Sequence, residues 1–307
     1  MTGLSVTPIR SVFRVRTVQN CQVSGDSGYR LVQLRNGVYS VHSLAYGETM
    51  HPGLGPEQEG RALYVDQLRL LERMRGYRGE FVVWDVGLGA AANALSVLQA
   101  SAGLSAPLRI VSFDSVLEPL AFAFANRKAL GYFEGCEYAV ETLLRGGRAE
   151  FRQGERSVVW ETRVTDFPSL VQQVKPGTWG WPHVILFDPW SPARNPAMWT
   201  AAVLSDLFRL LDPATPCAMP TYSRSTMLRV SLLLAGWWVG AGKATGRKEE
   251  TTIAANVRDL IDAPLDRRWL ARASRSKAAE PLWEPRYRQA PLAPETWERL
   301  RRHPQFQ

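Results

Sequence analysis

The sequence is poor in cysteine, in lysine and in long apolar runs. Its three cysteines, at positions 21, 136 and 217, form no closely spaced pair, so they predict neither a disulfide framework nor a zinc site. No stretch approaches the ~18 consecutive apolar residues of a membrane-spanning helix. The first residues alternate like a strand and lack the apolar core of a signal peptide. We therefore expect a cytoplasmic protein with reduced thiols and no membrane partner.

Positive charge comes almost entirely from arginine. The chain has 37 Lys and Arg residues, only five of them Lys, against 29 Asp and Glu, for a net charge of +8. Such an excess permits an anionic partner such as nucleic acid, but arginine-rich usage can also be compositional. Hydrophobic residues make up 45% of the chain and charged residues 21%. This balance excludes a wholly disordered chain.

The 307 residues divide into three regions by pattern. Residues 1–60 predict a small β-extension, with strands at 11–18, 29–34 and 38–41, followed by a Gly- and Pro-rich loop. Residues 61–256 form the main domain, entered by a helix expected at about 57–74. Residues 257–307 form a tail with 11 Arg or Lys against 7 Asp or Glu, six prolines and three tryptophans. Two interpretations of this tail stay open: a wrap docked by its tryptophans, or a basic arm that contacts nucleic acid.

Strands and helices alternate through the main domain. Continuous apolar runs at 81–87, 108–114, 158–164 and 183–188 are typical of strands buried on both faces. A fifth strand is expected at 216–222, and two late strands at 237–242 and 250–256. This alternation predicts an α/β, doubly wound, Rossmann-like domain with a seven-stranded, mostly parallel sheet.

The first buried strand ends in a glycine loop, Asp85-Val86-Gly87-Leu88-Gly89, which continues to Asn93. Two glycines let the chain turn sharply and bring its backbone close to a ligand, and the next helix directs its N-terminus there. Read as G-x-G-x-x-A, the loop fits dinucleotides. Read as D-x-G-x-G, it fits S-adenosylmethionine. A simple tight turn is the third possibility.

Two further strand ends carry aspartates. Asp114 ends IVSFD, where a carboxylate can accept hydrogen bonds from both ribose hydroxyls, and Asp166 could accept one from an adenine amino group. Each could equally be a helix N-cap. Because ligands bind at the carboxyl edge of such sheets, the succession of acidic residues favours a nucleoside site.

The fourth strand end, DPWSPARNPAMW, is a stiff loop with three prolines that presents Asp188, Trp190 and Arg194. Methylating an amine requires a free lone pair on nitrogen, and an aspartate can orient the amine and take its proton. Trp190 can stack on a base. The alternative is a structural turn. Lys248, in the later turn GRKEE, is either a contact to a substrate phosphate or part of an ordinary hairpin.

These segments, with NGVYSVHS, YGETMHPGLGPEQEG and PTYSRSTMLRVSLLLAGW, resemble the MnmC-type tRNA methyltransferases between about residues 36 and 256. The most specific piece is the proline-rich loop, because the family pattern there is Asp-Gly-Phe-Ala-Pro-x-Lys/Arg-Asn-Pro-x-Met-Trp. The sequence departs from the family at Ala90-Ala91-Ala92, where Thr-Gly-Leu is usual. It also departs at Pro189, which replaces a glycine, and in the tail.

The resemblance implies an S-adenosylmethionine-dependent enzyme without an oxidase domain. It would methylate the amine of 5-aminomethyluridine, or its 2-thio form, at tRNA position 34. Asp188 would be catalytic. The cofactor would contact residues of the first strands (Asp85, Gly87, Gly89, Asn93, Asp114 and Asp166). The substrate contacts would be Trp190, Arg194, Lys248 and Tyr46.

The same resemblance implies the partners. These are the anticodon region of tRNA and the upstream tRNA-modifying enzymes that supply the aminomethyl group. A monomer is favoured and no metal site is expected. Three alternatives remain: a methyltransferase of this fold with another amine substrate, a non-catalytic RNA-binding protein motivated by the alanine-rich loop, and an NAD-dependent oxidoreductase.

Overall fold

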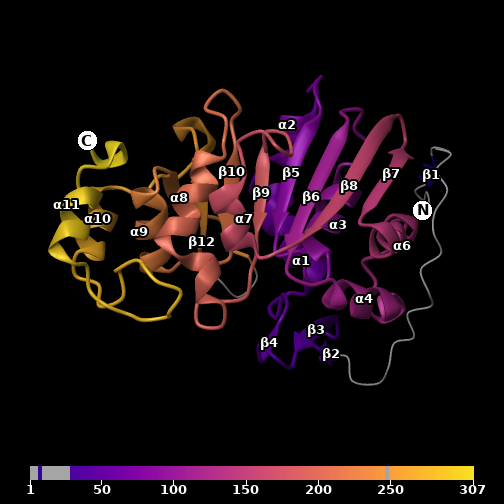
Figure 1. The fold of residues 1–307 in the computed structure, drawn as a ribbon, viewed down its shortest axis with the longest axis horizontal. Helices are drawn as coiled ribbons and strands as arrows, with labels where there is room; N and C mark the ends of the chain where they lie inside the picture. Colours follow the sequence, from indigo (N-terminus) through magenta and orange to yellow (C-terminus); the bar gives the residue numbers. More distant parts are fainter. Residues whose placement is uncertain (1–5, 9–27, 246–248) are drawn as a thin grey trace.

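The computed structural model describes residues 6–8, 28–245 and 249–307. A nine-stranded mixed sheet forms its centre, in the order β1-β7-β8-β6-β5-β9-β10-β12-β11 (Figure 1). The five central strands run parallel: β8 (Arg156–Val164), β6 (Leu108–Asp114), β5 (Phe81–Val86), β9 (Val184–Phe187) and β10 (Ala218–Thr221). The α/β doubly wound class predicted from the alternation is therefore confirmed.

The predicted count of seven strands is wrong by two. The strand β7 (Arg148–Gln153) pairs antiparallel with β8, and the edge strand β1 (Val6–Pro8) pairs antiparallel with β7. The segment RAEFRQ of β7 alternates buried and exposed residues, a pattern of a half-buried strand that the search for continuous apolar runs passed over. At the other edge, β12 (Thr251–Ala255) and β11 (Trp238–Gly242) form the expected antiparallel pair.

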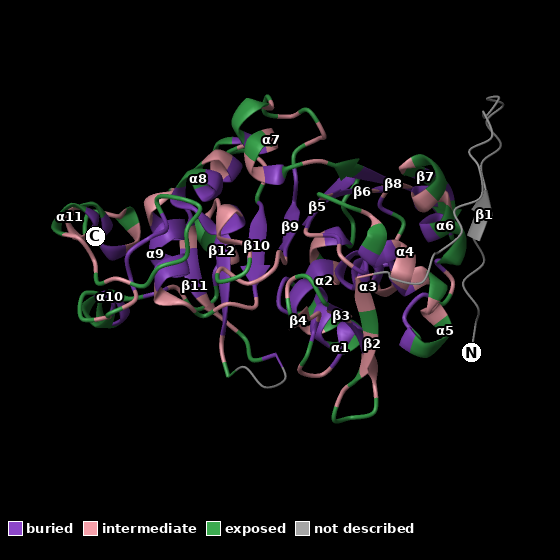
Figure 2. Ribbon diagram, turned by 60° about the horizontal axis from the view of Figure 1, so that its bottom comes forward, coloured by how far each residue is buried: buried purple, intermediate pink, exposed green. Residues whose placement is uncertain are grey.

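Helices cover both faces of the sheet and bury two separate apolar cores. On one face Val83, Ile110 and Leu186 pack with residues of α3 (Ala92–Ala100) and α6 (Glu137–Gly146). On the other face the next residues along the strands pack with α7 (Phe167–Gln173), α8 (Ala201–Arg209) and α9 (Thr226–Leu234). Side chains of a strand point alternately to opposite faces, so continuous apolar runs supply both cores. Figure 2 shows β5, β9 and β10 buried in the middle.

The helix expected at 57–74 is interrupted, which corrects that prediction. It consists of α1 (Pro56–Arg61), a π-helical turn (Ala62–Asp66) and α2 (Leu70–Met74), with Arg69 left-handed at φ 48°. Leu63, Tyr64 and Val65 are all buried. Three consecutive buried side chains are more than one face of a regular α-helix covers, and the π turn widens that face.

The N-terminal residues that the structure describes include a separate antiparallel sheet, β2 (Tyr29–Gln33), β3 (Tyr39–Ser43) and β4 (Glu48–Thr49). It lies below α1 in Figure 1. The strands expected at 29–34 and 38–41 are thus confirmed as β2 and β3. The strand expected at 11–18 lies outside the described residues.

The remaining helices are α4 (Glu118–Ala125) and α5 (Arg127–Leu130), with α10 (Arg267–Ala273) and α11 (Pro294–Leu300) near the C-terminus. Short 3₁₀ turns are formed by Pro196–Trp199, Arg258–Leu260 and Pro304–Phe306. Within the described ranges, no helix has the length and apolar character needed to cross a membrane.

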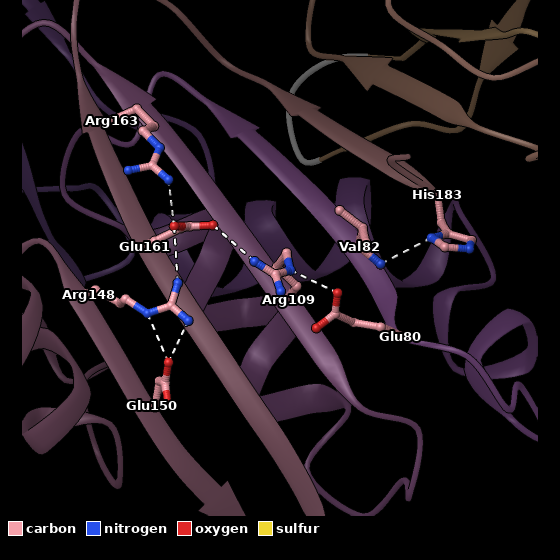
Figure 3. Close-up of polar contacts among 8 residues, drawn as sticks. All are labelled: Glu80, Val82, Arg109, Arg148, Glu150, Glu161, Arg163 and His183. Atoms are coloured by element: carbon pink, nitrogen blue, oxygen red, sulfur yellow. Dashed lines mark hydrogen bonds and ion pairs between the residues drawn. The ribbon is translucent and has the colours of Figure 1, made fainter. Parts of the chain in front are cut away.

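A charge ladder covers the face of β6 and β8 near the β7 edge (Figure 3). The carboxylate of Glu161 is 5% exposed and accepts from Arg109 Nη1 at 3.3 Å, Arg148 Nη1 at 3.2 Å and Arg163 Nη2 at 2.7 Å. Arg109 Nε also donates to Glu80 at 2.8 Å. The three guanidinium groups replace the water that the Glu161 carboxylate loses on burial. We therefore assign these ion pairs a structural role.

His183 ties the start of β9 to β5. Its Nδ1 accepts from the Val82 N–H at 3.0 Å (Figure 3), and its Nε2 lies 2.7 Å from the Tyr77 hydroxyl. Burial, reinforced by nearby Arg73, lowers the pKa of His183 to about 4. The ring is therefore neutral at physiological pH and can accept the backbone hydrogen bond that fixes the strand carrying Asp188.

Candidate functional site

A cavity of about 880 Å³ lies at the carboxyl ends of β5, β6, β9 and β10. This is the edge at which parallel α/β sheets bind ligands, and the volume suits a small-molecule site of about 300–1,000 Å³. Strand ends line one side, and β4 with the loop after it lines the other. The lining includes Tyr46, Glu48–Gly53, Gly87–Ala90, Asn93, Asp114, Asp166, Asp188–Trp190 and Thr221–Ser223.

The glycine loop lies directly against the end of β9. Gly87 has φ 89°, and a Cβ on it would lie 2.8 Å from the carbonyl oxygen of Asp188. Gly89 has φ 50°, and its N–H donates to Asp114 Oδ2 at 2.9 Å. Only glycine combines this backbone with such a close approach at position 87. The loop is thus held between two strands, and α3 directs its N-terminal N–H groups toward the cavity.

The alanines that follow do not fill the cavity. Ala91, at φ 63°, and Ala92 are buried in the core on the α3 side, and Ala90 is the one that lines the cavity. Their methyl groups therefore add to the packing under α3. The expectation that they close the site, which motivated the non-catalytic alternative, has no support in this geometry.

Asp114 and Asp166 both reach the cavity. Asp114 Oδ1 accepts from the Ser115 N–H at 2.8 Å, while Oδ2 takes the Gly89 N–H. Burial raises the pKa of Asp114, and these backbone donors oppose the rise. Asp166 is exposed, and its Oδ2 caps α7 by accepting from the Ser169 N–H at 3.1 Å. The cap and the cavity position therefore coexist, and the adenine contact of Asp166 stays a prediction.

Asp85 lies outside the cavity lining, which corrects its assignment as a direct cofactor contact. Its side chain is buried beneath the loop and accepts from Ser112 Oγ at 2.7 Å. Its Oδ1 has no hydrogen-bond partner in the described part of the chain. Desolvation raises the pKa of Asp85 to about 7. Asp85 lies opposite Ser112 of β6 in the strand register, so the two side chains share one face of the sheet and meet beneath the loop.

Asp188 is the centre of a polar cluster inside the cavity. Its Oδ2 accepts from Asn93 Nδ2 at 2.8 Å and lies 3.7 Å from His51 Nε2. The Tyr222 hydroxyl lies 3.4 Å from His51 Nδ1. Burial and the charge of Asp188 raise the pKa of Tyr222 well above its usual value, so the phenol stays protonated. A carboxylate, an imidazole and a phenol thus meet at one point.

His51 and Tyr222 were missed from the sequence. Both lie in segments that carry the resemblance, MHPG and PTYS, and a histidine inside a Gly- and Pro-rich loop was the available signal. His51 is buried and left-handed at φ 47°. Such backbone strain costs about 1–3 kcal/mol and persists where the surroundings over-determine it.

Glu59 supplies that constraint for the loop that carries His51. Its buried Oε1 accepts from the N–H groups of Gly53 at 2.6 Å, Leu54 at 2.7 Å and Gly55 at 3.3 Å. One carboxylate oxygen therefore fixes three consecutive peptide groups. The loop that carries His51 is thereby anchored to α1, independently of the strand that carries Asp188.

The proline-rich loop is joined to the N-terminal sheet by an aromatic pair. Trp190 stacks on Tyr46 with ring centroids 4.7 Å apart and planes at 18°. Ser191 donates its N–H to Glu48 at 3.1 Å and its hydroxyl to the same carboxylate. The structure thus brings together two predicted substrate residues from segments far apart in the sequence.

The other two predicted substrate residues are Arg194 and Lys248. Arg194 is exposed and lies outside the cavity lining. It belongs to the turn after Ser191, where the backbone N–H of Arg194 donates to the Ser191 carbonyl at 2.9 Å. A Cβ on Gly47, the residue after Tyr46, would lie 3.6 Å from Arg194 Nη2. Lys248 lies outside the described residues, so its phosphate contact stays a prediction.

The family of S-adenosyl-L-methionine-dependent methyltransferases matches residues 145–257, which contain Asp188 and the proline-rich loop. Over these 113 of the 307 residues, the chain is similar to that family. The chain is 27% identical over 248 residues to the tRNA 5-methylaminomethyl-2-thiouridine biosynthesis bifunctional protein MnmC of Methylibium petroleiphilum, covering 76% of this chain and 36% of that protein. It is 28% identical over 230 residues to the MnmC of Aeromonas hydrophila, covering 68% and 32%.

The chain spans about a third of the length of these curated relatives. Among solved structures, MNMC2 from Aquifex aeolicus aligns with a TM-score of 0.63 and 22% identity, over 84% of this chain and 79% of that one. That likeness confirms the Rossmann-like methyltransferase fold.

The cavity fits the cofactor that the family uses, S-adenosylmethionine. Gly87 and Gly89 line the cavity without side chains, so a ligand can approach their backbone there. Asp114 offers a carboxylate at the place where ribose is expected. The buried Oδ1 of Asn93 has no hydrogen-bond partner in the described ranges and can accept from the cofactor's amino group. The family match favours this cofactor over NAD.

Proposed function

We propose that this methyltransferase methylates the exocyclic amine of 5-aminomethyluridine, or its 2-thio form, at the wobble position of tRNA. The observation that carries the proposal is the Asp188 carboxylate, which faces the cavity at the end of β9 beside His51 and Trp190. The names of the curated relatives support the substrate, because they refer to tRNA 5-methylaminomethyl-2-thiouridine biosynthesis.

The reaction needs a neutral amine. The cofactor, when bound, supplies an electrophilic methyl group on sulfur. The nitrogen lone pair of the substrate forms the new N–C bond, the C–S bond breaks, and its electron pair stays on sulfur. An amine that arrives as an ammonium must therefore lose one proton before transfer, and the product amine loses another afterwards.

Asp188 and His51 are placed to handle these protons. Asn93 donates to Asp188 Oδ2 and holds the carboxylate in position. The carboxylate can then accept a hydrogen bond from the substrate amine and orient its lone pair toward the methyl group. His51 Nε2, at 3.7 Å from the same oxygen, can take the proton that leaves. The protonated Tyr222 fills the other side of the ring.

Trp190 and Tyr46 would hold the base. Their rings already form a parallel stack at the cavity wall. A flipped-out uridine can join such a stack, and base–aromatic stacking contributes about 1–3 kcal/mol per base. The upstream enzymes that install the aminomethyl group are part of this proposal, because the methyl acceptor must already carry an amine.

The test compares Asp188→Asn with Asp259→Asn, an exposed aspartate on the surface. Substrate tRNA is prepared from cells that cannot complete the modification, and methyl transfer from labelled S-adenosylmethionine is followed by nucleoside mass spectrometry. Asp188→Asn should lower the rate by about 10²–10⁴-fold, the usual contribution of acid–base catalysis. Its affinity for S-adenosylhomocysteine should stay within a few fold.

Two outcomes would count against the proposal. A wild-type rate in Asp188→Asn would remove the role of the carboxylate. Transfer by the wild-type enzyme to small amines, with none to tRNA, would favour the alternative of another amine substrate. In that case the rate would be insensitive to salt, whereas tRNA binding weakens steeply as salt rises.

A further inference from the structure

The C-terminal segment exposes a concentrated positive charge. Residues 267–288 contain seven Arg or Lys residues and two Glu residues, which is +5 of the chain's +8. One of the two acidic side chains, Glu280, is buried. All seven basic residues are exposed: Arg267, Arg268, Arg272, Arg275, Lys277, Arg286 and Arg288.

This segment is a fixed part of the fold. Gln305 donates from Nε2 to the carbonyls of Val239 at 2.7 Å and Leu265 at 2.9 Å, and it accepts from the Val239 N–H at 2.8 Å. Trp269 is buried and stacks on Phe306. The basic residues are therefore held on a folded platform at one end of the sheet (Figure 1).

Residues 282–289, the strap, form a loop closed at its base. The N–H groups of Ala279 and Glu280 both donate to the Ala290 carbonyl, at 2.9 and 3.0 Å. The Glu280 carboxylate accepts from the Ala293 N–H at 2.9 Å and from Trp283 Nε1 at 2.7 Å. A buried carboxylate thus organises a loop whose outer side is polar and aromatic.

The strap presents two aromatic rings between its arginines. Trp283 is 40% exposed and Tyr287 is 41% exposed. The Arg299 guanidinium lies 5.7 Å from the centre of the Trp283 ring, which holds that ring in place and leaves part of it open. Arg286 and Arg288 flank Tyr287 and form no ion pair in the described part of the chain.

The strap begins beside the proline-rich loop. Leu282 forms a parallel bridge with Thr200, and its carbonyl accepts from the Ala201 N–H at 2.9 Å. Trp199, the residue before Thr200, lines the cavity. Its Nε1 donates to the Trp190 carbonyl at 2.8 Å. A short chain of backbone contacts therefore links the strap to the loop that carries Trp190 and Asp188.

We propose that the strap and α10 form a docking surface for the RNA substrate, outside the cavity. Arginines bind phosphates, and exposed aromatic rings stack on unpaired bases. This arrangement suits the backbone and loop bases of a folded RNA whose target nucleotide enters the cavity. The inference rests on the proposed function for the identity of the RNA, and its test separates the two.

The test uses the full chain with the double substitution Arg286→Gln/Arg288→Gln. The matched control is Arg75→Gln/Arg78→Gln, two exposed arginines that precede β5 at the opposite edge of the parallel strands. Removal of residues after 256 would also remove Gln305 and Trp269 from the core, so point substitutions are used. Binding of unmodified tRNA transcript is measured by fluorescence anisotropy between 50 and 300 mM salt.

The strap variant should lose two phosphate contacts. At about 0.7 per contact on single strands, the slope of log affinity against log salt should fall by about 1.4, which is about a 25-fold weaker affinity at 0.1 M salt. The control should keep the wild-type slope. Affinity for S-adenosylhomocysteine and the Tm should stay at wild-type values in both variants.

The outcomes separate this inference from the proposed function. Unchanged affinity and slope in the strap variant, or an equal loss in the control, would overturn the docking surface. If the wild-type enzyme binds tRNA through the strap but transfers no methyl group to it, the docking surface stands and the proposed substrate fails. If tRNA is methylated equally well by both variants and the wild type, the proposed substrate stands and the docking surface fails.

Discussion

Replacing Gly87 by alanine tests the geometry of the cofactor loop directly. The new Cβ would lie 2.8 Å from the Asp188 carbonyl oxygen and 3.0 Å from the Pro189 nitrogen, with φ at 89°. Both neighbours are backbone atoms of the strand end that carries Asp188, so neither can rotate away. The backbone strain alone costs about 1–3 kcal/mol.

Two other glycines provide matched comparisons. Gly89→Ala keeps φ at 50°, inside the left-handed region, and its Cβ would meet the flexible end of Met50 at 3.3 Å. Gly146→Ala, near the end of α6, meets nothing within 4 Å and has no positive φ. We expect the largest destabilisation for Gly87→Ala, a smaller one for Gly89→Ala, and none for Gly146→Ala.

Thermal unfolding and calorimetry with S-adenosylhomocysteine measure both consequences. At about 2–4 °C per kcal/mol, the Tm of Gly87→Ala should fall by about 2–12 °C. The affinity of Gly87→Ala for S-adenosylhomocysteine should fall at least about tenfold, which corresponds to about 1.4 kcal/mol, because the loop must move away from the ligand. A wild-type Tm and affinity in Gly87→Ala, or a larger effect in Gly89→Ala, would refute this account of the loop.

Two further substitutions test the supporting residues. In wild type the folded state retains the Asp85 proton up to a pKa of about 7 while the unfolded state loses it near 3.8, so stability falls between these pH values. The free energy of unfolding of the wild type should decrease over this range by about 4 kcal/mol at most, and Asp85→Asn should abolish the decrease. Urea unfolding from pH 4 to 8 measures both. Glu59→Ala leaves three N–H groups unpaired, one buried and two partly buried, and should cost about 2–3 kcal/mol with loss of methyl transfer. Glu57→Ala, on the exposed side of α1, should match wild type in both assays.

The buried strands and the glycine loop could be predicted because their causes are local. A continuous apolar run such as FVVWDV satisfies both faces of a sheet, and the glycines at its end mark a turn whatever lies around it. The position of Asp188 at a strand end follows from the same argument. The strand β7 was missed because its alternating pattern is short and polar.

Long-range contacts could not be predicted. Asp85 belongs to the loop motif, but the sheet directs its side chain toward Ser112 on a neighbouring strand and away from the cavity. His51 meets Asp188 across 137 positions of sequence because Glu59 holds one loop and Asn93 holds the other side chain. Sequence spacing carries no information about such meetings.

The amino-acid sequence by itself determined the class of fold, the cofactor loop and the carboxylate at the fourth strand end. Each depends on local apolar pattern, glycine conformation or proline stiffness. Only the tertiary structure decided which side chains share the cavity and that Trp190 stacks on Tyr46. It also decided that the basic tail is folded beside the proline-rich loop. These features depend on how buried carboxylates and aromatic rings from distant segments satisfy one another once the sheet has formed.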